Sequence, residues 1–152
     1  MFSKKNERIY SLCLEEANKS SLLFQHGCIA TCGGKIIACG HNNNRTYTNN
    51  ELFLNNACTC HAEIAVLIKL YNRKKKRKLN KLMRRTTLYI SRIKNDEYNY
   101  TSAPCMECLL MIQHFNIKRI IFYLNNTFYN IKPNDYETHH HSYGQIYVNN
   151  YL

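Results

Sequence analysis

Two short stretches of this 152-residue chain hold side chains of the kinds that bind metal ions and move protons. The first is His61-Ala62-Glu63 and the second is Pro104-Cys105-Met106-Glu107-Cys108. One imidazole and two thiolates would fill three of the four tetrahedral positions of Zn²⁺, and the open fourth position is typical of a catalytic site rather than a structural one. The residue types therefore predict Zn²⁺ as cofactor, with Glu63 as an unligated proton carrier and with the ligands His61, Cys105 and Cys108.

The spacing of these residues predicts where they lie on their elements. Cys105 and Cys108 are three residues apart, so on a helix they share one face. His61 and Glu63 are two apart, about 200° around a helix, and can face one site only in its first turn. The metal would then lie off the N-terminal ends of two helices, where the helix dipoles favour thiolates.

Each of these assignments has a structural alternative. Cys58 or Cys60 is close enough in sequence to His61 to close a structural zinc site as a fourth ligand. Glu63 could simply stabilise a helix N-terminus with its negative charge. The run His139-His140-His141 is interpreted as a solvated loop, because three consecutive side chains point in different directions.

The pattern before residue 73 predicts two helices around a hairpin. Ser3 can cap a first helix over about residues 4–19, and Gly33-Gly34 separates two short apolar runs, which favours a tight antiparallel turn. The loop over residues 41–56 should lie near the site that follows it. A second helix begins near Cys60 or His61 and carries apolar residues at helical spacing.

The pattern after residue 85 predicts a strand over 86–92, a helix opened by Pro104 at its first position, and a strand over 120–124. This order makes a right-handed βαβ unit with parallel strands, and the sheet is therefore mixed. Residues 128–131 are expected to form a short strand. The remainder of the segment 126–152 is polar and only weakly defined, and 1–152 is interpreted as one domain.

The net charge of +11 arises from one place. Nine of the 21 basic residues fall within residues 73–85, and the twelve others face ten acidic residues. This stretch, Arg73–Arg85, is interpreted as a basic insertion that could contact nucleic acid, direct nuclear import or aid solubility.

Cys28, Cys32 and Cys39 are interpreted as small buried apolar residues, which fits a reducing compartment. With no run of 18 apolar residues and no secretory signal, we expect no membrane partner and a cytoplasmic location, with a nuclear one compatible.

The pattern His-x-Glu with a distant Pro-Cys-x-x-Cys resembles the zinc-dependent cytidine and deoxycytidylate deaminase superfamily. The resemblance covers about residues 5–125 and includes further segments in the family's order: His26–Ile29, Gly33–Ile37, Gly40–Asn42, Thr87–Ile90 and Ile117–Phe122. It departs from transfer-RNA adenosine deaminases, in which Glu stands where this chain has Ala103. The surplus length between His61 and Cys105 lies in the basic stretch and in residues 94–101.

The resemblance implies an α/β fold: a cytidine-deaminase-like three-layer α/β/α sandwich with a mixed five-stranded sheet. It implies a hydrolytic deaminase of a cytosine nucleoside or nucleotide that releases ammonia, in a homo-oligomer. Asn42 would hydrogen-bond the sugar or base, and the backbone N–H of Ala62 would meet a base carbonyl. Arg45 is a candidate for a substrate phosphate, on charge and position only; Asn42 and Arg45 could also be ordinary loop residues.

Two other functions stay open. Cytosine or adenine could be deaminated within RNA or DNA, with the basic stretch neutralising phosphates, and activity would then fall steeply with added salt. A non-catalytic binding protein could keep the fold and the zinc without turnover. Glu63 argues against the latter, since a structural zinc has no use for an acid there.

Overall fold

The computed structural model describes residues 2–46, 48, 53, 58–73, 75–94, 101–142, 145–146 and 149–150. The predicted loop over 41–56 and the predicted insertion over 94–101 therefore lie partly outside the described residues. Within the described part, no helix combines the length and the apolar character needed to cross a bilayer.

A five-stranded mixed sheet forms the middle of the molecule, in the order β2-β1-β3-β4-β5. The pairs β1–β2, β1–β3 and β4–β5 are antiparallel, and β3–β4 is parallel, as the βαβ pattern predicts. The turn between β1 and β2 has φ of +58° at Gly33 and +81° at Gly34, a conformation that favours glycine. The strands are β1 Gln25–Cys32, β2 Lys35–His41, β3 Thr86–Ile93, β4 Arg119–Leu124 and β5 Thr127–Ile131.

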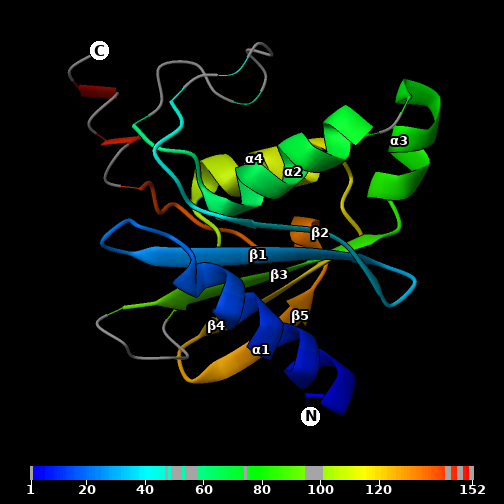
Figure 1. The fold of residues 1–152 in the computed structure, drawn as a ribbon, viewed down its shortest axis with the longest axis horizontal. Coiled ribbons are helices and arrows are strands. Elements are labelled where there is room, and N and C mark those ends of the chain that lie inside the picture. Colours follow the sequence, from blue (N-terminus) through cyan, green and yellow to red (C-terminus); the bar gives the residue numbers. More distant parts are fainter. Residues whose placement is uncertain are drawn as a thin grey trace.

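Helices cover both faces of this sheet, which confirms the predicted three-layer α/β/α arrangement (Figure 1). Helix α1 (Lys4–Asn18) lies on one face, while α2 (Ala62–Arg73) and α4 (Met106–His114) lie side by side on the other. Helix α1 begins where Ser3 Oγ accepts a hydrogen bond from the Asn6 backbone N–H at 3.2 Å. The predicted helix starts near residues 4 and 61 are thus confirmed to within one residue.

Two apolar clusters hold the layers together. The larger cluster fills the space between helices α2 and α4 and the face of the sheet that they cover. The smaller cluster joins α1 to the opposite face and consists of Ile9, Cys13, Ile29, Tyr89 and Ile121. None of the eight cysteines is joined in a disulfide. Cys28 is buried as predicted, whereas Cys32 and Cys39 are only half-buried, because Cys32 ends β1 beside the turn and Cys39 lies on the edge strand β2.

Helix α1 approaches the sheet closely at Gly27. A Cβ atom there would lie 2.3 Å from the Cys13 carbonyl oxygen and 2.7 Å from the Ala17 backbone nitrogen. Next to this contact, Glu16 bonds Lys19 Nζ at 2.8 Å and His41 Nδ1 at 3.1 Å. A glycine and a buried carboxylate therefore fix α1 against β1 and β2.

The outer edge of the sheet at β2 is bonded to α2. Lys69 Nζ donates to the Cys39 carbonyl at 2.5 Å, and the Arg73 guanidinium donates to the Ile37 carbonyl. These two carbonyls are two residues apart and so point to the same side of the strand.

Two details differ from the sequence-based expectations. The basic stretch contains a helix, α3 (Lys76–Met83), held by the buried Leu79 and Met83. The predicted helix start at Pro104 is wrong, because α4 begins at Met106 and Cys105 is its N-cap. The backbone of Cys105 is extended (φ −71°, ψ 170°), which leaves Pro104 outside the helix.

Candidate active site and metal centre

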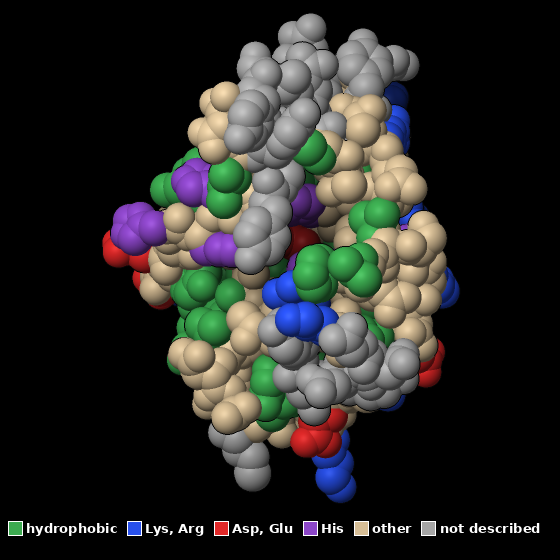
Figure 2. Space-filling model, turned by 90° about the vertical axis from the view of Figure 1, so that its left-hand side faces the viewer, with side chains coloured by type: hydrophobic (Ala, Val, Ile, Leu, Met, Phe, Trp, Pro, Cys, Tyr) green, Lys and Arg blue, Asp and Glu red, His purple; other side chains and the backbone are tan. Residues whose placement is uncertain are grey.

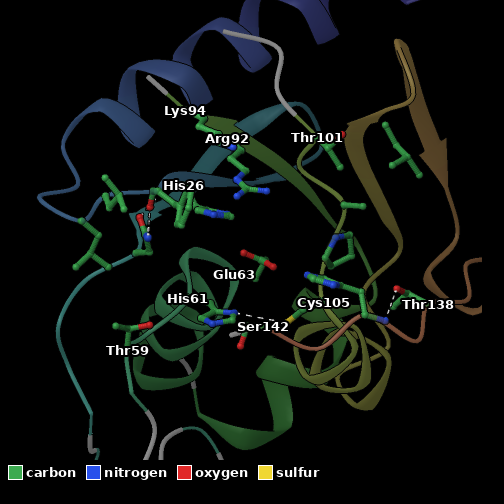
Figure 3. Close-up of a pocket in the computed structure, with 18 of the residues that line it drawn as sticks. His26, Thr59, His61, Glu63, Arg92, Lys94, Thr101, Cys105, Thr138 and Ser142 are labelled. Carbon is green, nitrogen blue, oxygen red and sulfur yellow. Dashed lines mark hydrogen bonds between the residues drawn. The ribbon is translucent and has the colours of Figure 1, made fainter. Parts of the chain in front are cut away.

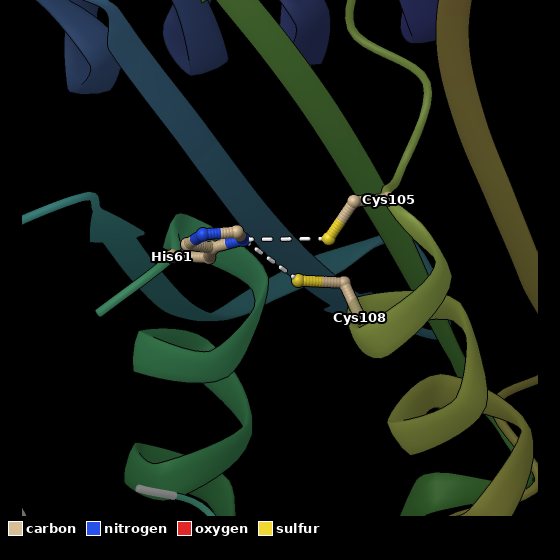
Figure 4. A group of neighbouring side chains, drawn as sticks. All are labelled: His61, Cys105 and Cys108. Carbon is tan, nitrogen blue, oxygen red and sulfur yellow. Dashed lines mark hydrogen bonds between the residues drawn. The ribbon is translucent and has the colours of Figure 1, made fainter. Parts of the chain in front are cut away.

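The candidate metal ligands meet where α2 and α4 begin, as their spacing predicts. His61 directly precedes α2, Cys105 caps α4, and Cys108 lies in the first turn of α4 (Figure 4). His61 Nδ1 is 3.2 Å from Cys108 Sγ and 3.5 Å from Cys105 Sγ, and the three donor atoms all lie within 4.8 Å of one another. Tetrahedral bonds of about 2.0 Å to nitrogen and about 2.3 Å to sulfur place such atoms about 3.6 Å apart. The donor set and its spacing therefore fit zinc.

Within the part of the chain that the structure describes, no fourth side-chain ligand joins this cluster. Among the residues that the structure describes, His61, Cys105 and Cys108 are the only group of three or more His, Cys, Asp or Glu side chains placed to hold one ion. Cys60 Sγ instead lies 3.6 Å from the His61 carbonyl oxygen, and Cys58 is exposed. Three donors with an open side are the arrangement expected of a catalytic metal site.

The pKa values of the Cys105 and Cys108 thiols are shifted in opposite directions. A hydrogen bond from Cys108 lowers the pKa of the Cys105 thiol to about 5 against the effect of burial, with help from His61. The same bond to Cys105, together with burial, raises the pKa of Cys108 well above its usual value. Burial acts to lower the pKa of His61, but the Cys105 thiolate raises it to about 9. A metal cation binding here would therefore displace protons.

Glu63 lies in the first turn of α2 and faces the cavity beside the ligands (Figure 3). Its side chain is only 4% exposed. Burial raises the pKa of its carboxyl group, while the positive charge of His61 acts in the opposite direction. A raised pKa makes the protonated form of this carboxyl group easier to reach, and a proton carrier must take up a proton as well as release it.

The cavity next to this cluster has a volume of about 780 Å³, within the range of small-molecule sites. Figure 2 shows acidic and histidine side chains within a hollow that lysine and arginine side chains border. In Figure 3, Glu63 lies between Arg92 and His26 on one side and Thr138 on the other. The cavity thus has a cationic rim and a second wall formed by the C-terminal segment.

Asn42 lines the cavity, as expected of a substrate-binding residue, and also holds the chain before β1. Its Nδ2 donates to the Phe24 carbonyl at 2.6 Å, and its Oδ1 accepts from the His26 N–H at 2.9 Å. An amide group has two donor hydrogens and two acceptor lone pairs, so these bonds use one of each kind.

The two other predicted substrate residues are placed differently. Ala62 is the first residue of α2 and is fully buried between the lining residues His61 and Glu63. Arg45 is exposed, and it is not among the described residues that line the cavity.

The sequence patterns did not predict the cationic rim, which consists of Arg92 and Lys94, with the imidazole of His26 beside them. His26 pairs with Arg92 in the β1–β3 register, and burial followed by the charge of Arg92 lowers the pKa of His26 to about 3. The Phe24 ring lies 5.0 Å from Arg92 Cζ and 5.8 Å from Lys94 Nζ. The signal that could have revealed the rim is the alternation Arg92, Ile93, Lys94 at the end of β3, which puts both cations on one face.

The C-terminal segment was also missed. Tyr136, Thr138, His140 and Ser142 line the cavity, and His141 forms an ion pair with Glu107 of α4. The expected solvated loop agrees with the exposed His139 and His140, although His140 also lines the cavity, and it is wrong for His141, which is half-buried and paired with Glu107. The histidine run is bonded to α4 by His140 and His141, and no local sequence pattern predicts these contacts.

Comparison with solved structures finds the same fold. The dCMP deaminase from the cyanophage S-TIM5, in complex with dCMP and dUMP, is 18% identical with a TM-score of 0.55, over 79% of this chain and 81% of that one. The cytidine deaminase from Burkholderia pseudomallei is 12% identical with a TM-score of 0.59, over 85% of this chain and 93% of that one. A search of curated protein sequences found no match.

A family model gives the more specific result. Residues 3–124 match the cytidine and deoxycytidylate deaminase zinc-binding region, and this range includes His61, Glu63, Cys105 and Cys108. The match covers most of the chain and agrees with the zinc-type donor set at the ends of α2 and α4. This chain therefore belongs to the cytidine and deoxycytidylate deaminase family that carries this zinc-binding region.

Proposed function

We propose that this protein hydrolyses the exocyclic C–N bond of a cytosine nucleoside or nucleotide and releases ammonia. The observation that carries the proposal is a buried carboxyl group, Glu63, beside a three-donor metal cluster in a cavity of nucleotide size. The reaction consumes one water and converts cytosine to uracil.

His61, Cys105 and Cys108 would hold the zinc ion, which when bound supplies a water of lowered pKa. Glu63 would accept a proton from the attacking water and deliver it to the ring nitrogen. It would then take the second proton from the hydroxyl group added to the ring carbon and deliver it to the departing amino group, so that uracil and ammonia are formed. One buried carboxyl group can do both, because its raised pKa brings the acid and base forms closer in energy near neutral pH.

The cationic rim favours a monophosphate over a free nucleoside. A phosphate ester carries a charge of about −1.5 to −2 at neutral pH. The Arg92 guanidinium offers paired donors that match phosphate oxygens, and Lys94 adds a second positive charge on the same face of β3. The similar S-TIM5 enzyme was solved with dCMP, a substrate of this class.

For the other predicted residues we propose roles that follow the family resemblance. Asn42 would bond the sugar or base with its remaining amide donor and acceptor, and the Ala62 N–H at the start of α2 would meet the base carbonyl. The phosphate is assigned to Arg92 and Lys94 instead of the exposed Arg45.

A panel of substrates tests the proposal. Ammonia release and ultraviolet spectral change would be followed for cytidine, deoxycytidine, their monophosphates, adenosine, guanine, and single-stranded RNA and DNA. We expect turnover of the cytosine monophosphates. No ammonia from any of the small molecules would contradict the proposal.

A substitution of Glu63 tests its role. Glu63→Ala should retain zinc by elemental analysis and lose most turnover, by a factor of at least about 10². The matched control is Glu15→Ala, an exposed glutamate on α1, which should behave like the parent. Turnover of Glu63→Ala within about tenfold of the parent would refute the proton-carrier role.

Deamination within a polynucleotide is the second candidate. It is favoured by exposed basic side chains on and around α3: Arg73, Lys75, Lys76, Arg77, Lys78, Lys81, Arg84 and Arg85. However, α3 follows the C-terminal end of α2, whereas the site lies at its N-terminal end (Figure 1). A 12-residue helix is about 18 Å long, so a base in the site and a phosphate on α3 would belong to distant nucleotides.

Organisation and location are proposed on the grounds given by the sequence. We propose that residues 1–152 form a single deaminase domain with a basic insertion at 73–85. We further propose a homo-oligomer located in the cytoplasm, with a nuclear location compatible.

A further inference from the structure

We propose that the segment Tyr136–Ser142 is a substrate-binding wall and that His140 contacts the sugar of the substrate and sets its specificity. The inference rests on the proposed function, because it takes the ligand to be a cytosine nucleotide. It concerns residues beyond the family match, which ends at residue 124.

Alternate residues of this segment face the cavity. Tyr136, Thr138, His140 and Ser142 all line it, whereas Glu137 and His139 do not, and His140 is itself exposed to solvent. A spacing of two is the period of an extended chain, in which successive side chains point to opposite sides. The backbone at Tyr136 is extended (φ −111°, ψ 132°). The wall therefore presents hydroxyl groups and one imidazole to the cavity.

Contacts to the core and to α4 fix this wall in place. The turn η1 (Pro133–Asp135) precedes it, and Gln113 Nε2 of α4 donates to the Pro133 carbonyl at 3.1 Å. The Tyr136 ring packs 5.0 Å from the ring of the fully buried Phe122. At the other end, the His141 imidazole pairs with the Glu107 carboxylate.

One of these contacts brings His140 close to the metal ligands. The Met106 N–H, in the residue after Cys105, donates to the His140 carbonyl at 2.8 Å. The His140 side chain and Cys105 line the same cavity. A base bound at the metal centre would therefore have its attached sugar within reach of the wall.

Different walls of the cavity would contact different parts of the substrate. The metal centre and Glu63 meet the base, and Arg92 and Lys94 on the rim suit the phosphate. The sugar joins base and phosphate and must lie between them. Thr138, His140 and Ser142 line the same cavity and offer donors and acceptors to the part of the substrate that lies between base and phosphate. Hydroxyl groups of ribose or deoxyribose are their natural partners.

The three consecutive histidines supply a matched set of variants. Each of His139→Ala, His140→Ala and His141→Ala would be checked for zinc content and for its circular dichroism spectrum. KM and kcat would then be measured for CMP and dCMP, and the binding of the products UMP and dUMP by calorimetry. His139 is exposed like His140 but does not line the cavity, so its variant is the control.

We expect His140→Ala to change the ratio of kcat/KM between CMP and dCMP by about tenfold, the effect of losing one hydrogen bond to one of the two sugars. His141 acts as a positioning residue, so His141→Ala should raise KM for both nucleotides to a similar extent and leave kcat nearly unchanged. His139→Ala should match the parent within about twofold.

The outcomes separate this inference from the proposed function. If the parent turns over CMP or dCMP but His140→Ala keeps the parent's ratio and product affinity, the wall inference is overturned and the proposed function stands. The parent could instead bind UMP or dUMP without turnover, and His140→Ala could alter the relative affinity for the two products. In that case the inference about the wall is supported and the proposed function is contradicted. A parent that binds neither product overturns both.

Discussion

Glu63 and Arg92 lie on different sides of one cavity and serve different ends of the proposed substrate (Figure 3). The carboxyl group is buried in the first turn of α2, and the guanidinium lies at the end of β3. Removal of the Glu63 carboxyl group should therefore slow the chemical step, whereas removal of the Arg92 guanidinium should weaken the binding of the phosphate.

Arg92→Gln should raise KM for the monophosphate by about 10- to 100-fold, since a hydrogen bond to a charged group contributes about 1.5–3 kcal/mol. The KM for the corresponding nucleoside should change much less, because that substrate has no phosphate. Steady-state kinetics with both substrates checks this, with Arg8→Gln on the exposed side of α1 as control. An equal rise for nucleoside and monophosphate would contradict phosphate recognition by Arg92.

Residue type and short spacing predicted the metal centre. His61, Cys105 and Cys108 need only two helix starts to come together, and the sequence marks both. The rim and the wall could not be predicted in this way. His26 and Arg92 become neighbours only through the β1–β3 register, and His140 reaches the cavity only through its bond to Met106.

At the scale of elements, the contact of α1 with β1 depends on the absence of a side chain at Gly27. Gly27→Ala should lower the free energy of unfolding by about 1–3 kcal/mol, because the new Cβ would collide with backbone atoms of Cys13 and Ala17 that cannot turn away. Urea denaturation measures this. Gly33→Asn is the control: nothing lies within 4 Å of a Cβ there, and Asn tolerates its positive φ. Equal stability of Gly27→Ala and the parent would show that α1 can move away from the sheet.

The Glu16 carboxylate links α1 to His41 of β2, and the stability that this bond contributes depends on pH. Burial acts to raise the pKa of Glu16, but its bonds to Lys19 and His41 lower it below the usual 4.5. A lowered folded-state pKa gives stability that is present above the unfolded pKa and is lost as the pH falls through the folded value.

Glu16→Gln should therefore cost about 1 kcal/mol of unfolding free energy at pH 7, and the cost should shrink as the pH falls below about 4. Denaturation of both proteins across this pH range measures it, with the exposed Glu15→Gln as control. A cost that stays constant down to low pH would contradict a role for the ionised carboxylate.

Elements with a local signature were predicted well. The Gly33-Gly34 hairpin, helices α1 and α2 and the βαβ unit each carry a turn, a cap or a regular apolar period. Helix α3 was missed because only Leu79 and Met83 anchor it within a run of cations. The start of α4 was predicted two residues early because Pro104 resembles a first helical residue, whereas Cys105 takes the cap.

At the scale of the whole molecule, the excess charge and the site lie at opposite ends of α2. Replacing Lys76, Arg77, Lys78 and Lys81 together with Gln should leave turnover of a small nucleotide within about twofold of the parent. Helix α2, which is about 18 Å long, separates α3 from the site, and salt screens charges over such a length. The assay is repeated with single-stranded RNA and DNA at low and high salt. A large loss with the small nucleotide would show that α3 takes part in its binding.

The bonds from Lys69 and Arg73 to the β2 carbonyls have a consequence for how copies of this protein could associate. A strand from another molecule would need these carbonyls as acceptors, and α2 already occupies them. The sheet is therefore closed to edge-to-edge growth at β2.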